Sequence, residues 1–317
     1  MTARRAALLG GLTALLIAGA AGVPGRSAVD PSIRLRYGLR PGAAYDQTTT
    51  LALAMQIKSE GLPEAAATLI QAIVKDSKQD LRLQGRVETG AKGGDGSLPL
   101  TYRLVDAKGT LTMGGQTKDL LGDPQRLAGA TLGGRLLPDG RTIDLSGGPG
   151  DAAHPMPSGV KDRIIQSLPA LPDRDIRIGE RFEVPGGISL AGLPGGAQGQ
   201  IEAKCAFTLK SLDDGVAVFD VLQTMSVPSG TSLPGNRTLA VSGGGTGTAT
   251  YDRREGIFTS LKMEMDVLVT MGMSGAAVGG DPRLQQLPPG TVAEAVSIKA
   301  AVRGPMAVTM ARAPAAP

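Results

Sequence analysis

Residues 260–271 read SLKMEMDVLVTM and show the strictest alternation of apolar and polar residues in the chain. A repeat of two residues is typical of a β-strand that has one face in a core and the other in water. The residues expected to face inward are Leu261, Met263, Met265, Val267, Val269 and Met271. The residues expected to face outward are Ser260, Lys262, Glu264, Asp266 and Thr270.

The same period recurs along the chain and predicts a mainly β fold. Alternating segments occupy 48–58, 80–88, 201–210, 296–303 and 306–310. Asp139-Gly140, Asp214-Gly215 and Gly256 supply the backbone freedom that tight hairpins need. The 46 glycines, some of them within strand-like stretches, favour bulges and bends. We therefore expect a curved antiparallel sheet, or sheets, built from two sequential strand sets.

Two segments depart from this period and predict short amphipathic helices. Residues 63–76 begin with Pro63 and Glu64, and an apolar stripe follows at Leu69, Ile70, Ile73 and Val74. Residues 158–168 place Val160, Ile164 and Leu168 four residues apart. Both helices are expected to pack on the apolar face of a sheet.

The first residues indicate export. Arg4 and Arg5 precede an apolar run that ends in small residues, which is the pattern of a signal peptide within 1–28. An uncleaved N-terminal anchor is the alternative. We expect no membrane span after cleavage and a periplasmic or extracellular location. The mature chain is predicted to comprise an N-terminal strand set with one helix (29–150), a C-terminal strand set (151–311) and a frayed tail (312–317).

The stretch LPALPDRDIRIGERF, residues 168–182, separates the two strand sets. Its dense charges allow two interpretations, a functional site or a structural joint. Pro169 and Pro172 hold the backbone extended, and Ile176 and Ile178 alternate with charged residues as in a short strand. We therefore interpret the stretch as a joint whose charges face water.

The inventory of reactive side chains disfavours an enzyme. Cys205 and His154 are the only cysteine and histidine. One cysteine cannot form a disulfide within the chain, and the two residues are too few for an ordinary zinc site. A single histidine also disfavours a serine or cysteine hydrolase, because the nucleophile needs a neighbouring base. Paired carboxylates occur at 173/175, 213/214 and 264/266, on outward faces or in turns. Aromatic residues make up 3% and the formal net charge is +4, without the basic stripe that nucleic-acid binding requires. We expect no cofactor, no metal and no nucleic-acid partner.

A series of motifs resembles a family of uncharacterised exported β-rich bacterial proteins, known only as a domain of unknown function. The motifs are Gly42-x-x-Tyr45, LLPDGRTI (136–143), the stretch 168–182 and GTATYDRREGIFTSLKMEMDV (247–267). Phe182 stands where the family commonly has tryptophan. The resemblance covers most of 32–311 and implies export and a β-rich fold, without catalytic residues. The alternation is also loosely similar to the half-barrels of periplasmic lipoprotein carriers, which hold acyl chains under helices.

The apolar stripe is the candidate site for a lipid or another apolar small molecule. Its predicted residues are Met55, Leu261, Met263, Met265, Val267, Met271, Met306 and Met310. Flexible thioethers suit varied apolar ligands, but the same residues also fill ordinary cores. Two hypotheses follow: an exported non-enzymatic protein that binds an apolar ligand in a concave sheet, or a structural or partner-binding envelope module with a fully packed core.

Overall fold

The fold is mainly β, as the alternation predicts. The computed structural model describes residues 31–62, 64–74, 76–121, 127–145, 164, 168–189, 200–228, 232–233, 237–274 and 295–314. The elements before the joint are β1 (Ser32–Arg34), β2 (Ala44–Glu60), α1 (Glu64–Val74), β3 (Ser77–Thr89), β4 (Leu98–Met113), β5 (Gln116–Asp119), β6 (Thr131–Leu136) and β7 (Ile143–Asp144). Those from the joint onward are β8 (Asp175–Arg177), β9 (Arg181–Ser189), β10 (Gln200–Asp213), β11 (Val216–Ser226), β12 (Ser232–Leu233), β13 (Arg237–Asp252), β14 (Ile257–Ser274) and β15 (Ala295–Arg312).

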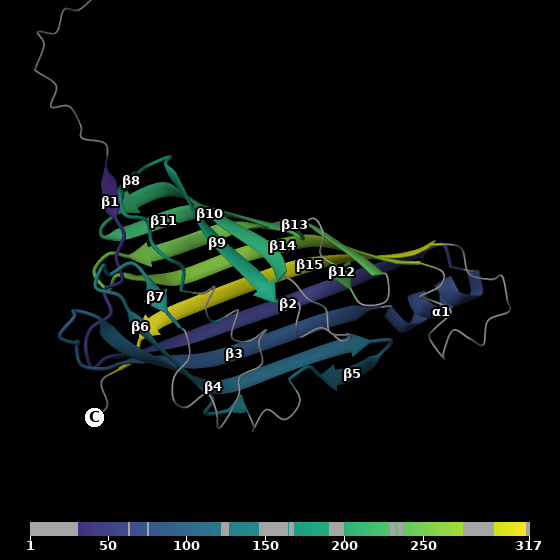
Figure 1. Ribbon diagram of the computed structural model, residues 1–317, viewed down its shortest axis with the longest axis horizontal. Coiled ribbons are helices and arrows are strands. Elements are labelled where there is room, and N and C mark those ends of the chain that lie inside the picture. Colours follow the sequence, from purple (N-terminus) through teal and green to yellow (C-terminus); the bar gives the residue numbers. More distant parts are fainter. Residues whose placement is uncertain are drawn as a thin grey trace, which may run out of the picture. The chain divides into compact units, whose positions relative to one another are not determined.

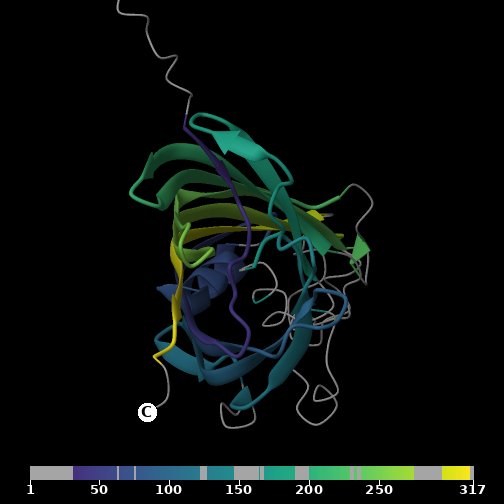
Figure 2. The same ribbon diagram turned by 90° about the vertical axis from the view of Figure 1, so that its left-hand side faces the viewer.

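One antiparallel sheet of 13 strands contains all but two of these strands. Its order is β7-β6-β4-β3-β2-β15-β14-β13-β11-β10-β9, with β5 beside β4 and β12 beside β13 (Figure 1). Seen along the strands, the sheet curls strongly around one of its faces (Figure 2). We call the concave face the inner face and the convex face the outer face.

The burial of β14 confirms the predicted faces. On the inner face Met263 is 3% exposed and Met265 is 8% exposed. Lys262, Glu264 and Asp266, which alternate with them, are exposed on the outer face. A strand with one buried face alternates in this way because successive side chains point to opposite sides of the sheet.

β15 joins strands from before and after the joint in one sheet. β15 pairs with β14 on one side and with β2 on the other, so that Val302 lies opposite both Val267 and Met55. The sequence predicts two separate segments here, at 296–303 and 306–310. The structure instead has one strand that passes through Gly304-Pro305. Gly304 has a φ of +146°, which a residue with a side chain rarely adopts.

A second glycine-rich stretch is also a strand rather than a connection. The sequence places VSGGGTGT (241–248) among the Gly/Pro-rich loops. In the structure it lies in β13, between β11 and β14. A Cβ atom at Gly247 would lie 1.9 Å from the Lys262 carbonyl oxygen, so the close approach of the two strands requires glycine at this position. Glycine content alone does not separate such a strand from a loop.

Residues 31–40, which we call the strap, cross one end of the inner face (Figure 2). Ile33, Leu35, Tyr37 and Leu39 alternate inward and are buried. The strap begins as β1, which pairs with β8. The Tyr37 backbone N–H then donates to the Gly140 carbonyl at 2.7 Å, and the Gly38 N–H donates to the Gly256 carbonyl at 2.9 Å. The strap is thus bonded to turns of both strand sets.

Buried tyrosines fasten the strap. The Tyr251 hydroxyl accepts from the Arg36 N–H at 3.1 Å and donates to the Arg36 carbonyl. The Tyr45 hydroxyl accepts from the Arg40 N–H at 3.0 Å. Burial raises the pKa of Tyr251 above its ordinary value. The ring therefore stays neutral and keeps its proton for the bond to the Arg36 carbonyl.

The charges of the joint lie on the surface, as the joint interpretation expects. Arg34 pairs with Asp173 at 2.8 Å, and Arg174 pairs with Glu180 at 2.6 Å. The Arg177 backbone N–H and then the Arg174 guanidinium hold the pKa of Glu180 below its ordinary value. Exposed pairs of this kind contribute little to stability.

One prediction for the joint is wrong. Ile176 is buried, but Ile178 is 47% exposed. The two residues do not share a strand face because β8 ends at Arg177. Gly179 then reverses the chain with a φ of +85°.

The helix predictions are tested only in part. Residues Glu64–Val74 form α1, which contacts β2. The side chains of Leu69, Ile70 and Ile73 lie outside the described residues, so the predicted packing of a helix on the apolar face is not supported by the described part. Most of 158–168 also lies outside it; Ile164 and Leu168 are described and buried. Within the described residues, no helix is both long and apolar enough to cross a membrane.

Tyr251→Phe tests the fastening of the strap. The change leaves the Arg36 N–H and carbonyl without their partner, so we expect the free energy of unfolding to fall by about 1–3 kcal/mol. Tyr45→Phe removes a single hydrogen bond and should cost less. Urea denaturation measures both, and equal stabilities of Tyr251→Phe and the wild type would contradict the assignment.

Gly304→Ala tests the continuity of β15. The added Cβ atom would lie 2.1 Å from the Ala52 carbonyl oxygen. With the positive φ, this should cost at least about 2 kcal/mol. Gly115→Ala is the matched control, because Gly115 also has a positive φ but has nothing within 4 Å of its Cβ position. That variant should lose about 1 kcal/mol, and a ranking in the opposite order would rule out the proposed constraint.

Candidate functional site

The predicted site residues lie on three neighbouring strands, β2, β15 and β14. Register places Met263 opposite Met306 and Val267 opposite Val302, which is itself opposite Met55. Met263, Met265, Val267 and Met310 are buried, whereas Met55, Leu261, Met271 and Met306 are half-buried. The sequence therefore predicts correctly that these residues share one face of the sheet. It does not predict which of them are buried and which are half-buried.

The inner face is filled at the strap end. All four phenylalanines of the chain gather there; Phe182 stacks on Phe207 at 5.0 Å and Phe258 contacts Tyr251 at 5.3 Å, measured between ring centroids. Leu168 and Leu171, from the joint, are buried in the same core. Met310 lies in this region opposite Gln47. This part of the face is an ordinary packed core.

Met263 and Met265 fill space that a glycine leaves on the neighbouring strand. A Cβ atom at Gly245 would lie 2.7 Å from the Met265 sulfur and 3.0 Å from the Met263 methyl group. Both thioethers therefore cover the Gly245 backbone. The contacts of Met263 and Met265 are therefore those of residues that fill an irregular core.

Toward the opposite end, most apolar residues of the inner face are half-buried, although Val296 is only 1% exposed. Leu239 and Met271 pack against a second cluster of buried apolar residues. We call the half-buried residues of this end the half-buried patch. It comprises Leu53, Met55 and Ile57 on β2, Ile298, Ala300 and Val302 on β15, Val269 and Met271 on β14, and Leu239 on β13. The strands are adjacent and in register, with Ile57 opposite Ala300 and Ala300 opposite Val269. The patch is therefore continuous across the strands.

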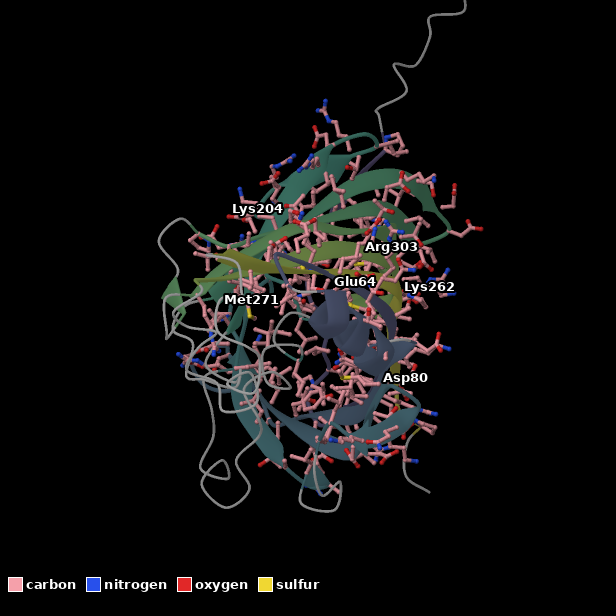
Figure 3. All side chains as sticks on the ribbon, turned by 90° about the vertical axis from the view of Figure 1, so that its right-hand side faces the viewer. Glu64, Asp80, Lys204, Lys262, Met271 and Arg303 are labelled. Carbon is pink, nitrogen blue, oxygen red and sulfur yellow. The ribbon has the colours of Figure 1, made fainter. Side chains whose placement is uncertain are left out.

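The side-chain view supports this division of the two faces. Figure 3 shows Lys262, Arg303 and Asp80 on the outer side of the curved sheet and Met271 on the inner side. The outer face thus carries charges along β3, β14 and β15. Hydrated charged groups strongly resist transfer to a hydrocarbon environment, so the outer face is suited to water and the patch is suited to an apolar group.

The inner face also carries polar residues, among them Gln223 and Cys205. Gln223 is 6% exposed, and its amide oxygen has no hydrogen-bond partner among the described residues. Cys205, on the next strand, lies opposite it. Burial raises the pKa of the Cys205 thiol, and a hydrogen bond from Gln223 partly opposes this rise. A thiol held in its neutral form is a poor nucleophile.

Sequence reasoning missed a cation at the end of the patch. Arg237 begins β13 and shares the face of Leu239 and Val241. It is half-buried, and its Nε atom has no hydrogen-bond partner among the described residues. No signal in the sequence marks it, because it follows a Pro/Gly-containing stretch that reads as a loop.

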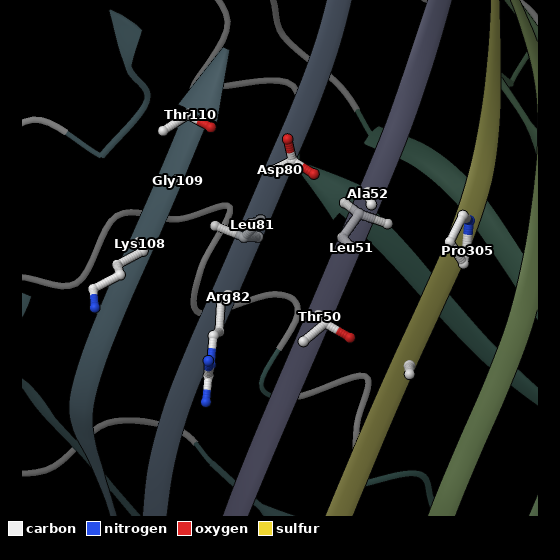
Figure 4. Close-up of a pocket in the computed structure, with 11 residues that line it drawn as sticks. Thr50, Leu51, Ala52, Asp80, Leu81, Arg82, Lys108, Gly109, Thr110 and Pro305 are labelled. Carbon is white, nitrogen blue, oxygen red and sulfur yellow. The ribbon is translucent and has the colours of Figure 1, made fainter. Parts of the chain in front are cut away.

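A hollow of about 300 Å³ lies on the outer face (Figure 4). Its rim carries Asp80 and Arg82 from β3 and Lys108 from β4, and small residues such as Ala52 and Gly109 form its floor. Arg82 lies opposite Lys108 in the sheet register. These charged side chains are exposed, so water competes for each of them.

The carboxylate pairs considered for catalysis are exposed. Glu264 and Asp266 lie on the outer face, Asp213 and Asp214 lie where β10 ends, and Asp173 and Asp175 lie in the joint. No group of three or more metal-binding side chains occurs within the described residues. His154 lies outside them.

No protein-family model and no curated protein sequence matches this chain. Among solved structures, the chain is similar to the outer membrane protein OprG from Pseudomonas aeruginosa, with 8% identity, 87% of this chain and 100% of that chain covered, and a TM-score of 0.21. It is also similar to the type IV competence pilus secretin PilQ of V. cholerae, with 10% identity, 86% and 59% covered, and a TM-score of 0.13. TM-scores this low carry no argument about fold or function.

Methionine oxidation measures the division between the packed core and the half-buried patch. Dilute peroxide should convert Met55 and Met271 to sulfoxide several-fold faster than Met263 and Met265, because oxidation follows accessibility. Peptide mass spectrometry over a time course reports each site. Equal rates for the two pairs would show that the patch is no more accessible than the core.

Proposed function

We propose that this protein is exported and holds an apolar ligand, the acyl chain of a lipid, against the half-buried patch without catalysing a reaction. The observation that carries the proposal is the change along the inner face from a filled core to a continuous set of half-buried apolar residues. An exposed apolar surface that is continuous and rimmed by polar residues is typical of a binding site.

The energetics favour a hydrocarbon occupant. Apolar surface removed from water contributes about 25 cal/mol per Å², or about 0.8 kcal/mol for each buried CH₂ group. Met55 and Met271 lie at opposite sides of the patch, and flexible thioethers adapt to chains of different shape. An acyl chain is the simplest ligand that matches a long apolar face with no charge along it.

The position of α1 supports a role as a cover. α1 follows β2 directly and contacts it. It lies beyond the ends of β2 and β3 in Figure 1, and within the curve of the sheet when seen from that end in Figure 3. A ligand on the patch would extend toward this helix.

Export is part of the proposal and rests on the signal-peptide pattern of Arg4, Arg5 and the apolar run that follows. The expected location is the periplasm or the extracellular space. This fold is compatible with an oxidising compartment. Cys205 is its only cysteine, and burial raises the pKa of its thiol, which favours the protonated, unreactive form.

A structural or partner-binding envelope module is the second candidate. The filled strap end favours it, because a core of this kind needs no ligand to be stable. In that case the half-buried patch would be covered by a partner protein, and no lipid would be bound.

Native mass spectrometry of protein purified without detergent tests ligand binding, together with displacement of a fluorescent fatty-acid probe. We expect a co-purifying lipid or a saturable probe signal. Met271→Gln should weaken probe binding by about three- to tenfold, because it places an amide in the patch.

Leu268→Gln is the matched control, since Leu268 is 41% exposed on the outer face of the same strand. It should bind the probe as the wild type does. A protein that is empty and also ignores the probe would leave the envelope-module candidate standing and exclude the ligand-binding one.

A further inference from the structure

Arg237 brings a positive charge to the inner face at the end of the half-buried patch. Side chains two residues apart on a strand share a face, so Arg237 projects on the same side as Leu239 and Val241. Leu239 lies opposite Met271, and Met271 lies opposite Ile298. The guanidinium therefore adjoins the row of apolar residues that ends the patch.

This guanidinium has no counter-charge among the described residues. Two cations near the same end of the sheet are paired on the outer face: Lys299 lies 2.7 Å from Glu60, and Arg303 lies 3.0 Å from Asp266. Arg237 is half-buried, makes no ion pair with a described carboxylate, and has a buried Nε without a hydrogen-bond partner. A partly desolvated charge without a partner is costly, which points to a ligand group that would pair with it.

The spacing fits a single-chain amphiphile. The half-buried patch extends across four neighbouring strands, from Leu239 on β13 to Met55 and Ile57 on β2. Neighbouring strands lie about 4.8 Å apart, so the patch spans about 14 Å across the sheet. An acyl chain placed across these strands would keep its tail on apolar residues and its head beside the guanidinium.

We propose that Arg237 binds the anionic head group, a carboxylate or a phosphate, of a single-chain lipid whose tail occupies the half-buried patch. The planar guanidinium fork matches both oxyanions with paired N–H donors. The described inner face between Arg237 and the filled core has no other charged residue to compete for the head. This inference rests on the proposed function and specifies the ligand class.

The experiment compares three probes that share a twelve-carbon chain: dodecanoate, dodecyl phosphate and uncharged 1-dodecanol. Calorimetry measures the dissociation constants for the mature wild type, Arg237→Gln and Lys299→Gln. The wild type should bind at least one anion more tightly than the alcohol. Arg237→Gln should weaken that anion about tenfold or more and leave 1-dodecanol unchanged, because a hydrogen-bonded ion contact is lost while the apolar contacts remain.

Lys299→Gln removes the same charge from the outer face, so it controls for net charge. It should leave all three dissociation constants unchanged. The anion that shows the larger loss in Arg237→Gln identifies the head group. Arg237→Lys keeps the charge but not the fork and should lose less, which also provides a comparison if Arg237→Gln does not fold.

Equal effects of Arg237→Gln and Lys299→Gln on anion binding, with 1-dodecanol still bound, would overturn the role of Arg237 and leave the proposed function intact. Failure of the wild type to bind any of the three probes would overturn the proposed function and this inference together.

Discussion

The pairing of β15 with β2 is the constraint on which the rest of the structure depends. It joins residues near the C-terminus to the first long strand, and it places β2, β15 and β14 side by side. Without it, Met55 and Val267 would belong to the faces of two separate sheets. The continuous inner face, its filled strap end and its half-buried patch all require this one non-local contact. Pairing at such separation in sequence forms late because the chain must first close a large loop.

Much of the strand pattern could be predicted from the sequence, because alternation reports burial directly. Leu51, Met263 and Val267 face inward and Lys262 and Glu264 face outward, as their period of two requires. The same reasoning failed at Gly304-Pro305 and in the stretch 241–248. There, glycine has no side chain to show a period, and close contact between neighbouring backbones rather than loop geometry explains its presence.

The candidate site could be predicted only as a face. Local sequence placed Met263 and Met271 in one stripe, but it could not show that the first is buried in the core and the second is only half-buried. Segments that are distant in the sequence cause this difference, because the strap and the joint pack on only one end of the inner face. Arg237 was missed for a related reason: its position at the start of a strand, on the face of Leu239, becomes visible only once the register with β14 is known.

The position of β15 after the other described strands also orders events during synthesis. A ribosome releases the N-terminus first, so the hydrogen-bonding edge of β2 has no partner until residues 295–312 emerge. Until then the nascent chain exposes an unpaired strand edge and much of its apolar face, both of which promote association with other chains. A chain that lacks residues 295–312 leaves this edge of β2 permanently open to pairing with other chains.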